Sequence, residues 1–156
     1  MNKKPVLALE TSGSVCSASV YFSDDKFYSV NFQHRNIHAE KIYDAVDYVL
    51  KTAGIDIKDL FAIAVSSGPG SFTGLRIGMS AAKGLAFGAS LPIIPAPTFE
   101  AIALQLSGIL PDKTIFAIAN KVNTDELYFS KFQINANNFI FVEDLQIISK
   151  DLLGEK

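Results

Sequence analysis

Hydrophobic and polar positions follow several different periods along this chain, and each change of period predicts a new secondary-structure element. Apolar residues alternate with polar ones, or form a short unbroken run, in three segments near the beginning, which predicts antiparallel strands at residues 6–9, 16–23 and 27–34. From residue 37 to residue 53 the apolar positions recur every three or four residues, which is the period of an amphipathic helix. Gly54 then supplies the signal for the end of that helix.

Strands and helices alternate in the next part of the chain. The unbroken apolar run at 61–65 predicts a buried strand, and a helix follows at 73–88. A short strand at 91–94 is followed by a rigid proline-containing connection at 95–97, and then by a third helix at 99–106 that Thr98 caps and Gly108 ends. Three strands followed by alternating helices and strands predict an α/β fold, with a mixed sheet and helices on both faces, as in ribonuclease-H-like lobes.

A change of composition at residues 108–113 predicts a boundary between a first lobe at 1–108 and a second part at 109–156. The second part has three further strand patterns, at 114–119, 126–134 and 138–148, which predict an antiparallel meander. This looks like the opening of a second lobe for which no helices remain. Its many aromatic residues must be shielded, so we expect the meander to pack on the end of the first lobe through the third helix, or against a second copy of the chain.

The helix at 73–88 has three kinds of surface. Its polar residues Arg76, Ser80 and Lys83 form one narrow stripe, and a flank of larger apolar residues suits packing on a sheet. The other flank is small and consists of Gly74, Gly78, Ala81, Ala82 and Leu85. Glycine inside a helix costs roughly 1 kcal/mol relative to alanine, so the two glycines indicate a packing reason. We therefore expect another helix to approach this small flank closely.

The junction before this helix is rich in glycine and hydroxyl groups. Gly68 and Gly70 permit a tight turn, and Ser71 and Thr73 are possible helix caps. Such a junction can hold an anion on its backbone N–H groups, or it can be a capped turn that binds nothing, and geometry alone favours the second. A Walker loop is excluded because Leu75 follows Gly74 where lysine is required, and the glycine spacing is one residue too long for a dinucleotide fingerprint.

Composition narrows the classes of protein that need to be considered. The chain has 156 residues, 49% of them apolar and 19% charged, with a net charge of −2 and scattered lysines. Disorder and direct binding of nucleic acid are therefore disfavoured. A single cysteine, Cys16, excludes an intrachain disulfide and is expected to be a small core residue. We expect no signal peptide, no membrane span and a cytoplasmic location.

Several motifs together resemble the bacterial TsaB (YeaZ) family. The most specific is Ser-Gly-Pro-Gly-Ser-Phe-Thr-Gly-Leu-Arg-Ile-Gly at residues 67–78. Leu-Glu-Thr-Ser at 9–12, Cys-Ser-Ala at 16–18, His38 before the first helix and Pro-Thr-Phe-Glu-Ala at 97–101 complete the likeness. It covers roughly residues 6–106 and implies the fold of the actin, sugar-kinase and Hsp70 superfamily.

The resemblance also implies a function. TsaB members are non-catalytic partners of TsaD, the transferase that places a threonylcarbamoyl group on the adenosine beside the anticodon of certain tRNAs, and TsaE, an ATPase, joins them. Pairing uses the first two helices, so the implied interface is Ala39, Ile42, Tyr43, Val46, Gly74, Gly78, Ala81, Ala82 and Leu85. The implied contact with tRNA is indirect, and a homodimer is expected when the partner is absent.

The family's nucleotide machinery is expected to be vestigial in this chain. The residues that would form the remnant of the phosphate loop are Glu10, Thr11, Ser12, Gly68, Gly70 and Ser71. Glu10 stands where the family usually has aspartate, and Lys-Val-Asn at 121–123 stands where an Asp-Ala-Arg type segment is usual. Because the rest of the second lobe is also missing, we expect no cofactor and no metal.

Two other functions stay open at this stage. One is an enzyme, either a superfamily ATPase or a metallopeptidase, because His34 and His38 have a spacing that can bind a metal on a helix. Arg35 stands where an HExxH site requires glutamate, which argues against it. The other is a self-associating protein that has lost its partner and closes a symmetric dimer through the small flank.

Overall fold

The computed structural model describes residues 4–33 and 37–155 of the chain. It divides into two compact units, residues 1–96 and residues 97–156. The division lies one helix earlier than the boundary that the composition predicted at residue 108. Each unit is described by itself.

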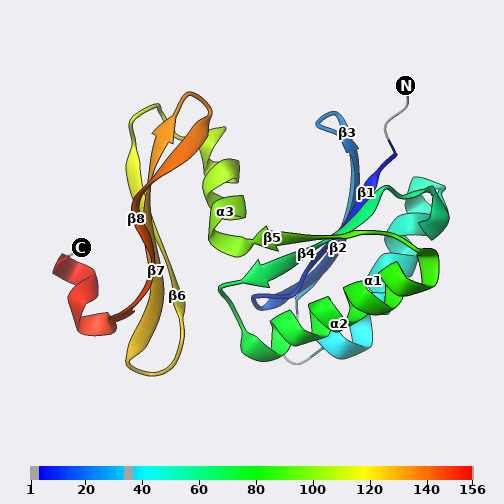
Figure 1. Ribbon diagram of the computed structural model, residues 1–156, viewed down its shortest axis with the longest axis horizontal. Coiled ribbons are helices and arrows are strands. Elements are labelled where there is room, and N and C mark those ends of the chain that lie inside the picture. Colours follow the sequence, from blue (N-terminus) through cyan, green and yellow to red (C-terminus); the bar gives the residue numbers. More distant parts are fainter. Residues whose placement is uncertain (1–3, 34–36, 156) are drawn as a thin grey trace. The chain divides into compact units, whose positions relative to one another are not determined.

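The first unit is built on a five-stranded mixed sheet (Figure 1). Its strands are β1 (Val6–Glu10), β2 (Val15–Ser23), β3 (Lys26–Gln33), β4 (Ala62–Gly68) and β5 (Ile93–Pro97), in the order β3-β2-β1-β4-β5. β2 is antiparallel to both β1 and β3, whereas β1 and β4 are parallel. This arrangement confirms the predicted ribonuclease-H-like fold class.

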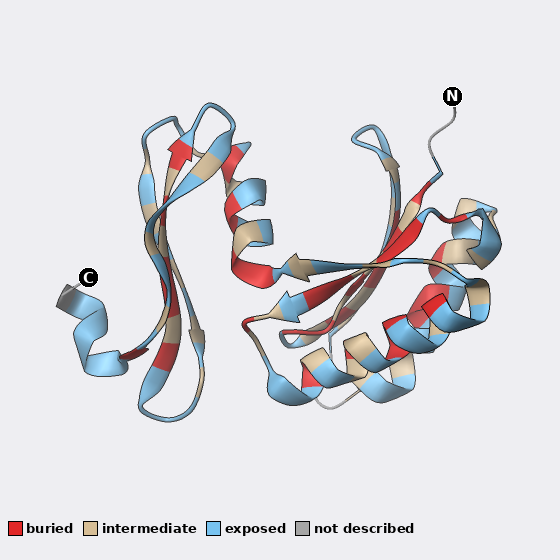
Figure 2. Cartoon of the chain, in the orientation of Figure 1, coloured by how far each residue is buried: buried red, intermediate tan, exposed pale blue. Residues whose placement is uncertain are grey.

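Two long helices cover one face of this sheet. α1 (His38–Ala53) packs on β2 and β3, α2 (Phe72–Ala89) packs on β1 and β4, and the helices contact each other. A single 3-10 turn, η1 (Ile57–Asp59), lies between α1 and β4. The core below the helices consists of aliphatic and small residues, and Leu7, Ala18 and Ile63 have no exposed surface. Figure 2 shows buried residues in red along the strands of this unit.

The prediction of helices on both faces depends on the third helix. Within the described residues of the first unit the two α-helices lie on the same face of the sheet, and the third helix is grouped with the second unit. Another difference is that the segment 95–97, predicted as a connection, is the end of β5. Proline is tolerated in β5 because β5 is an edge strand. On the side of an edge strand that has no neighbouring strand, the missing N–H of proline costs no hydrogen bond.

The second unit joins one helix to a three-stranded antiparallel sheet. α3 (Thr98–Ser107) precedes β6 (Ile115–Lys121), β7 (Glu126–Asn135) and β8 (Asn138–Ser149), and the chain continues into the 3-10 helix η2 (Lys150–Glu155). The meander that the sequence predicted is therefore confirmed. α3 begins directly after Pro97 and ends at Gly108, but Thr98 is its first residue and not its cap.

An aromatic cluster forms the core of the second unit. The Phe132 ring is fully buried, and its centroid lies 5.7 Å from that of Phe116, 5.4 Å from that of Phe139 and 5.0 Å from that of Phe141. From α3, Phe99 and Ala103 pack onto this cluster. α3 thus shields the aromatic face, which explains why it groups with the second sheet and not with the first.

Candidate functional site

Two loops meet at the carboxyl ends of the neighbouring parallel strands β1 and β4, where ligands bind in many open α/β sheets. The Ser71 N–H donates a hydrogen bond to the Ser12 carbonyl at 2.7 Å. The Thr11 hydroxyl, which is fully buried, donates to the Gly74 carbonyl at 2.8 Å. The structure therefore brings together the residues that the sequence assigned to a vestigial phosphate loop.

Three backbone N–H groups of this junction donate hydrogen bonds within the chain. The Ser12 N–H donates to the Glu10 carboxylate, the Ser71 N–H to Ser12, and the Gly74 N–H to the Ser71 hydroxyl at 3.2 Å. Ser71 is thus the N-cap of α2, as predicted, and Thr73 lies inside the helix. A phosphate cradle needs such N–H groups free to point at the ligand. The geometry favours the capped turn over the anion site.

Two positions in the junction require glycine, each for a different physical reason. Gly68 has φ of +102°, a conformation that side-chain-bearing residues rarely adopt. A Cβ on Gly70 would lie 2.6 Å from the Ser12 Cβ, so Gly70 lets the two loops touch. Both glycines serve the contact between the β1 and β4 loops.

The small flank of α2 faces the interior of the first unit. A Cβ on Gly74 would lie 2.0 Å from the Thr11 carbonyl oxygen, and a Cβ on Gly78 would lie 2.2 Å from the Thr11 hydroxyl oxygen. Ala81 and Ala82 are also buried. At Gly74 and Gly78 the close neighbour is therefore the end of β1 in the same unit, and not a second helix as the sequence predicted.

The predicted interface residues therefore separate into two groups. Ile42, Val46, Gly74, Gly78, Ala81 and Ala82 are buried and Leu85 is half-buried, whereas Ala39 and Tyr43 are exposed. Periodicity correctly identified which α2 residues share a face. It did not reveal which of two apolar flanks packs on the sheet.

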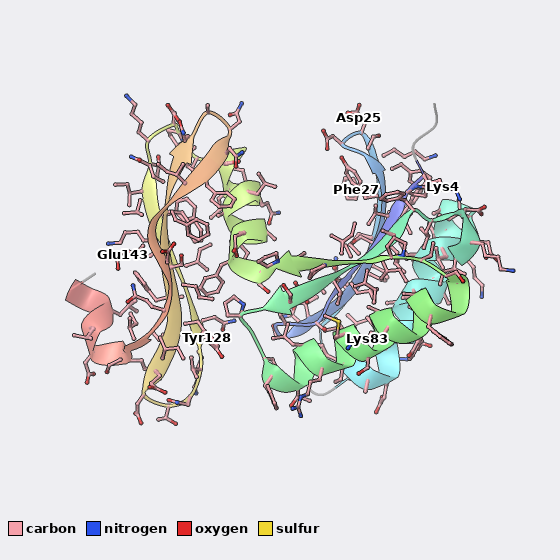
Figure 3. The ribbon with its side chains drawn as sticks, in the orientation of Figure 1. Lys4, Asp25, Phe27, Lys83, Tyr128 and Glu143 are labelled. Atoms are coloured by element: carbon pink, nitrogen blue, oxygen red, sulfur yellow. The ribbon has the colours of Figure 1, made fainter. Side chains whose placement is uncertain are left out.

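An open groove lies between α1 and α2. Its volume is about 420 Å³, and it is lined by Ala39, Ile42, Tyr43, Phe72, Thr73, Arg76, Ile77, Ser80 and Ala81. Tyr43 is 53% exposed and Phe72 is 67% exposed. The Arg76 guanidinium stacks on the Phe72 ring, with its central carbon 3.8 Å from the ring centroid. Figure 3 draws the side chains of both helices and labels Lys83 on α2.

Sequence reasoning missed Phe72, Thr73 and Ile77 as groove residues. The available signal was the polar stripe of Arg76 and Ser80, because the exposed side of a helix is where such a stripe lies. That stripe was evident from the sequence, but the partner contact was expected on the opposite flank of α2.

The described residues give no support to a metal centre. No group of three or more histidine, cysteine, aspartate or glutamate side chains is positioned to hold a metal within 4–33 and 37–155. His38 begins α1, and its Nε2 lies 3.1 Å from the Gly13 carbonyl oxygen, whereas His34 and Arg35 lie outside the described residues.

Cys16 is buried, and burial raises the pKa of its thiol. No helix in the same ranges has the length and apolar character required to cross a membrane.

Comparisons with known proteins agree on a family. Residues 33–135 match the model of the TsaD family, tRNA N6-adenosine threonylcarbamoyltransferase. The tRNA threonylcarbamoyladenosine biosynthesis protein TsaB of Haemophilus influenzae is 34% identical over 84% of this chain, and that of Escherichia coli is 32% identical over 93%. The structure of YeaZ from Pseudomonas aeruginosa superposes with a TM-score of 0.81 at 26% identity over 92% of this chain. The chain spans 55% and 62% of the two TsaB proteins and 67% of the YeaZ chain.

Proposed function

The chain belongs to the TsaD family and is similar to the TsaB proteins, and we propose that it is a non-catalytic partner subunit of a TsaD-type transferase. The modification would be the threonylcarbamoyl group on the adenosine beside the tRNA anticodon. The names of the TsaB relatives, as threonylcarbamoyladenosine biosynthesis proteins, support this process. The chain spans less than two thirds of the length of those relatives. We therefore propose the modifying activity for the assembled complex and not for this chain alone.

The groove between α1 and α2 is the observation that carries the proposal. Tyr43 projects from α1 and Phe72 from α2, and both side chains are more than half exposed at its edges. Aromatic anchors around an apolar groove are typical of surfaces that receive an amphipathic helix. We assign this groove to a helix of the TsaD-type partner.

The charge of α2 specifies the partner further. α2 carries Arg76 and Lys83 and no acidic residue. A partner helix with acidic side chains beside its apolar anchors would complement this surface and speed association. Basic residues in the same place would repel it.

The junction of β1 and β4 supports a role without catalysis. Three of its N–H groups donate within the chain, and the Thr11 hydroxyl is engaged with Gly74. We propose that turnover belongs to the TsaD-type protein and to a TsaE-type ATPase that joins the complex in the cytoplasm. Since the chain has a net charge of −2, we propose that tRNA is bound through the complex and not by this chain alone.

Two phenylalanines on α2 allow a matched test of the groove. Phe72 lines it, whereas Phe87, which is 91% exposed, does not. We expect Phe72→Ala to weaken binding to the TsaD-type protein of the same organism by about tenfold or more, equivalent to about 1.4 kcal/mol. Phe87→Ala should leave the affinity unchanged. Calorimetric titration measures both, and a tRNA modification assay with purified components tests whether the chain is required.

A second matched pair lies on α1. Tyr43 lines the groove, and Tyr48, similarly exposed, lies outside it. We expect Tyr43→Ala to weaken pairing and Tyr48→Ala to have no effect. Equal losses from Phe72→Ala and Phe87→Ala, with equal losses from both tyrosine variants, would remove the groove from the interface. Full modification activity without this chain would contradict the proposed function itself.

A further inference from the structure

The loop between β1 and β2, residues 11–14, contacts the beginnings of both helices that form the groove. The Ser12 carbonyl accepts a hydrogen bond from the N–H of Ser71, the N-cap of α2, at 2.7 Å. The next residue contacts α1 instead, because the Gly13 carbonyl oxygen lies 3.1 Å from Nε2 of His38, the first residue of α1. One short loop therefore joins the beginning of α1 to the beginning of α2.

His38 is the side chain that attaches α1 to this loop. A carbonyl oxygen only accepts hydrogen bonds, so Nε2 of the ring must carry a hydrogen and donate it. Ser71 caps α2 with its side chain, whereas the side chain of Ile37, the N-cap residue of α1, makes no capping hydrogen bond. The backbone of His38 is also in contact with β2, because the Cys16 thiol lies 3.9 Å from its carbonyl oxygen. The His38 ring thus holds the start of a helix whose N-cap side chain does not.

This attachment lies at one end of the groove. Ala39 follows His38 and Phe72 follows Ser71, and both line the groove. Ile42, one helical turn after His38, also lines the groove and is 1% exposed. The spacing of the two walls matters for a partner helix, because packed helices approach one another to about 8–10 Å. The bond from the His38 ring is therefore placed where it can fix that spacing.

We propose that His38 is a positioning residue for the groove, an inference that rests on the proposed function of the groove. Its hydrogen bond to Gly13 holds the first turn of α1 at the distance from α2 that the partner helix requires. Without this bond the first turn must be ordered when the partner binds, and the cost of ordering lowers the affinity. The imidazole is not among the groups that line the groove, so it acts through Ala39 and Ile42.

Two amides of different length test this role. Asparagine and glutamine both carry an NH2 donor, but only the glutamine nitrogen lies as far along the side chain as imidazole Nε2. We expect His38→Asn to raise the dissociation constant of the complex with the TsaD-type protein by about three- to tenfold, the equivalent of one lost hydrogen bond. His38→Gln should bind with nearly the affinity of the parent chain. Calorimetric titration measures both variants.

Two control variants change the neighbouring residues and keep the bond. Gly13→Ala retains the carbonyl acceptor, and no atom beyond its chain neighbours lies within 4 Å of the added Cβ. Glu40→Gln removes an exposed acidic group from the first turn of α1, which weakens the helix terminus without changing the loop. Both should leave the affinity unchanged in a high-salt buffer, which screens exposed charges. If Glu40→Gln and His38→Asn lower the affinity equally, general weakening of the helix explains both and the proposal is overturned.

Nuclear magnetic resonance of the isolated chain tests the bond without a partner. The nitrogen chemical shifts of the His38 ring should show a hydrogen on Nε2. His38→Asn should displace the amide resonances of Ala39 on α1 and of Phe72 on α2, and His38→Gln should displace them less. A ring without hydrogen on Nε2 would overturn the proposal, and so would an unchanged Phe72 resonance in His38→Asn.

The outcomes separate this inference from the proposed function. Circular dichroism melts establish that each variant is folded before its affinity is compared. If Phe72→Ala weakens the complex and His38→Asn does not, the positioning role is wrong and the proposed function stands. If the parent chain does not bind the TsaD-type protein, the proposed function is wrong and the positioning role is overturned with it.

Discussion

The two units contain the same arrangement of three strands and stabilise it differently. β1-β2-β3 and β6-β7-β8 are both antiparallel meanders in chain order. In the first unit two helices cover the sheet, and α2 approaches so closely that Gly78 has no room for a side chain. In the second unit one shorter helix covers an aromatic cluster around Phe132. A close backbone approach and the stacking of large rings are thus two solutions to the same problem of burying one face of a meander.

The largest effect is expected from removing the ring at the centre of the second unit. Phe132→Ala should lower the free energy of unfolding of that unit by about 3–5 kcal/mol, because it deletes a buried ring that contacts three others. Hydrogen–deuterium exchange should show lost protection in β6, β7 and β8 and preserved protection in β1 and β4. Phe27→Ala, at a position that is 61% exposed, is the control and should cost well under that amount. Equal loss of protection in both units would mean that they do not unfold separately.

The next effect concerns the close approach in the first unit. Gly78→Leu should destabilise this unit by about 1–3 kcal/mol or more, since even a Cβ would lie 2.2 Å from the Thr11 hydroxyl oxygen. Gly88→Leu, at a position with no atom within 4 Å of an added Cβ, should instead be neutral or stabilise the helix by up to about 1 kcal/mol. Thermal melts of the isolated chain compare the two. An unchanged melting temperature for Gly78→Leu would mean that the small flank of α2 is not packed inside the unit and is available to a partner.

A smaller effect distinguishes two buried threonines, one in each unit. Thr11 donates a hydrogen bond to Gly74, whereas the Thr98 hydroxyl at the start of α3 has no hydrogen-bond partner among the described residues. Thr11→Val should cost about 0.5–1.5 kcal/mol, and Thr98→Val should be neutral or stabilising because it removes an unsatisfied buried group. Chemical denaturation measures both variants. If Thr98→Val lowers the free energy of unfolding as much as Thr11→Val does, the proposed difference between the two hydroxyl groups is wrong.

The last and smallest effect concerns Cys16, which serves as a reporter of the first unit. Burial raises the pKa of its thiol, so the reactive thiolate should be scarce and alkylation by iodoacetamide slow in the folded chain. The raised pKa stabilises the folded state below the ordinary thiol pKa, and this contribution is lost as the pH rises through the folded-state pKa. Gly78→Leu should accelerate alkylation and Phe132→Ala should not. Mass spectrometry at pH 8 follows the reaction, and acceleration by Phe132→Ala would show that the units are coupled.

Much of the fold was predictable because it depends on local patterns. The helical period from residue 37, with Gly54 in the left-handed conformation that ends α1, specified that helix to within one residue. The hydroxyl of Ser71 in front of a helical pattern identified the N-terminus of α2. The strands of both meanders also agree with their predicted positions to within two residues at each end.

The candidate site was less predictable, and the reasons are specific. The small flank of α2 was assigned to a partner because sequence spacing cannot distinguish a neighbouring helix from a neighbouring loop. Of the predicted interface residues, Tyr43 lies at the groove, whereas Phe72, which also lines it, was absent from the prediction. Phe72 is the first residue of α2, where a helical period has only just begun and gives little information about the face.

By itself, the amino-acid sequence determined the order of the elements, the C-cap of α1, the N-cap of α2 and the family to which the chain belongs, since each depends on residues close together in the chain. Only the tertiary structure decided which flank of α2 is buried, because that depends on Thr11, which lies 63 residues before Gly74. It also decided that α3 joins the second unit, where the Phe99 side chain packs against aromatic rings of β6, β7 and β8. Contacts between distant segments are selected by shape and volume, and a hydrophobic period records only that a face is buried, not what buries it.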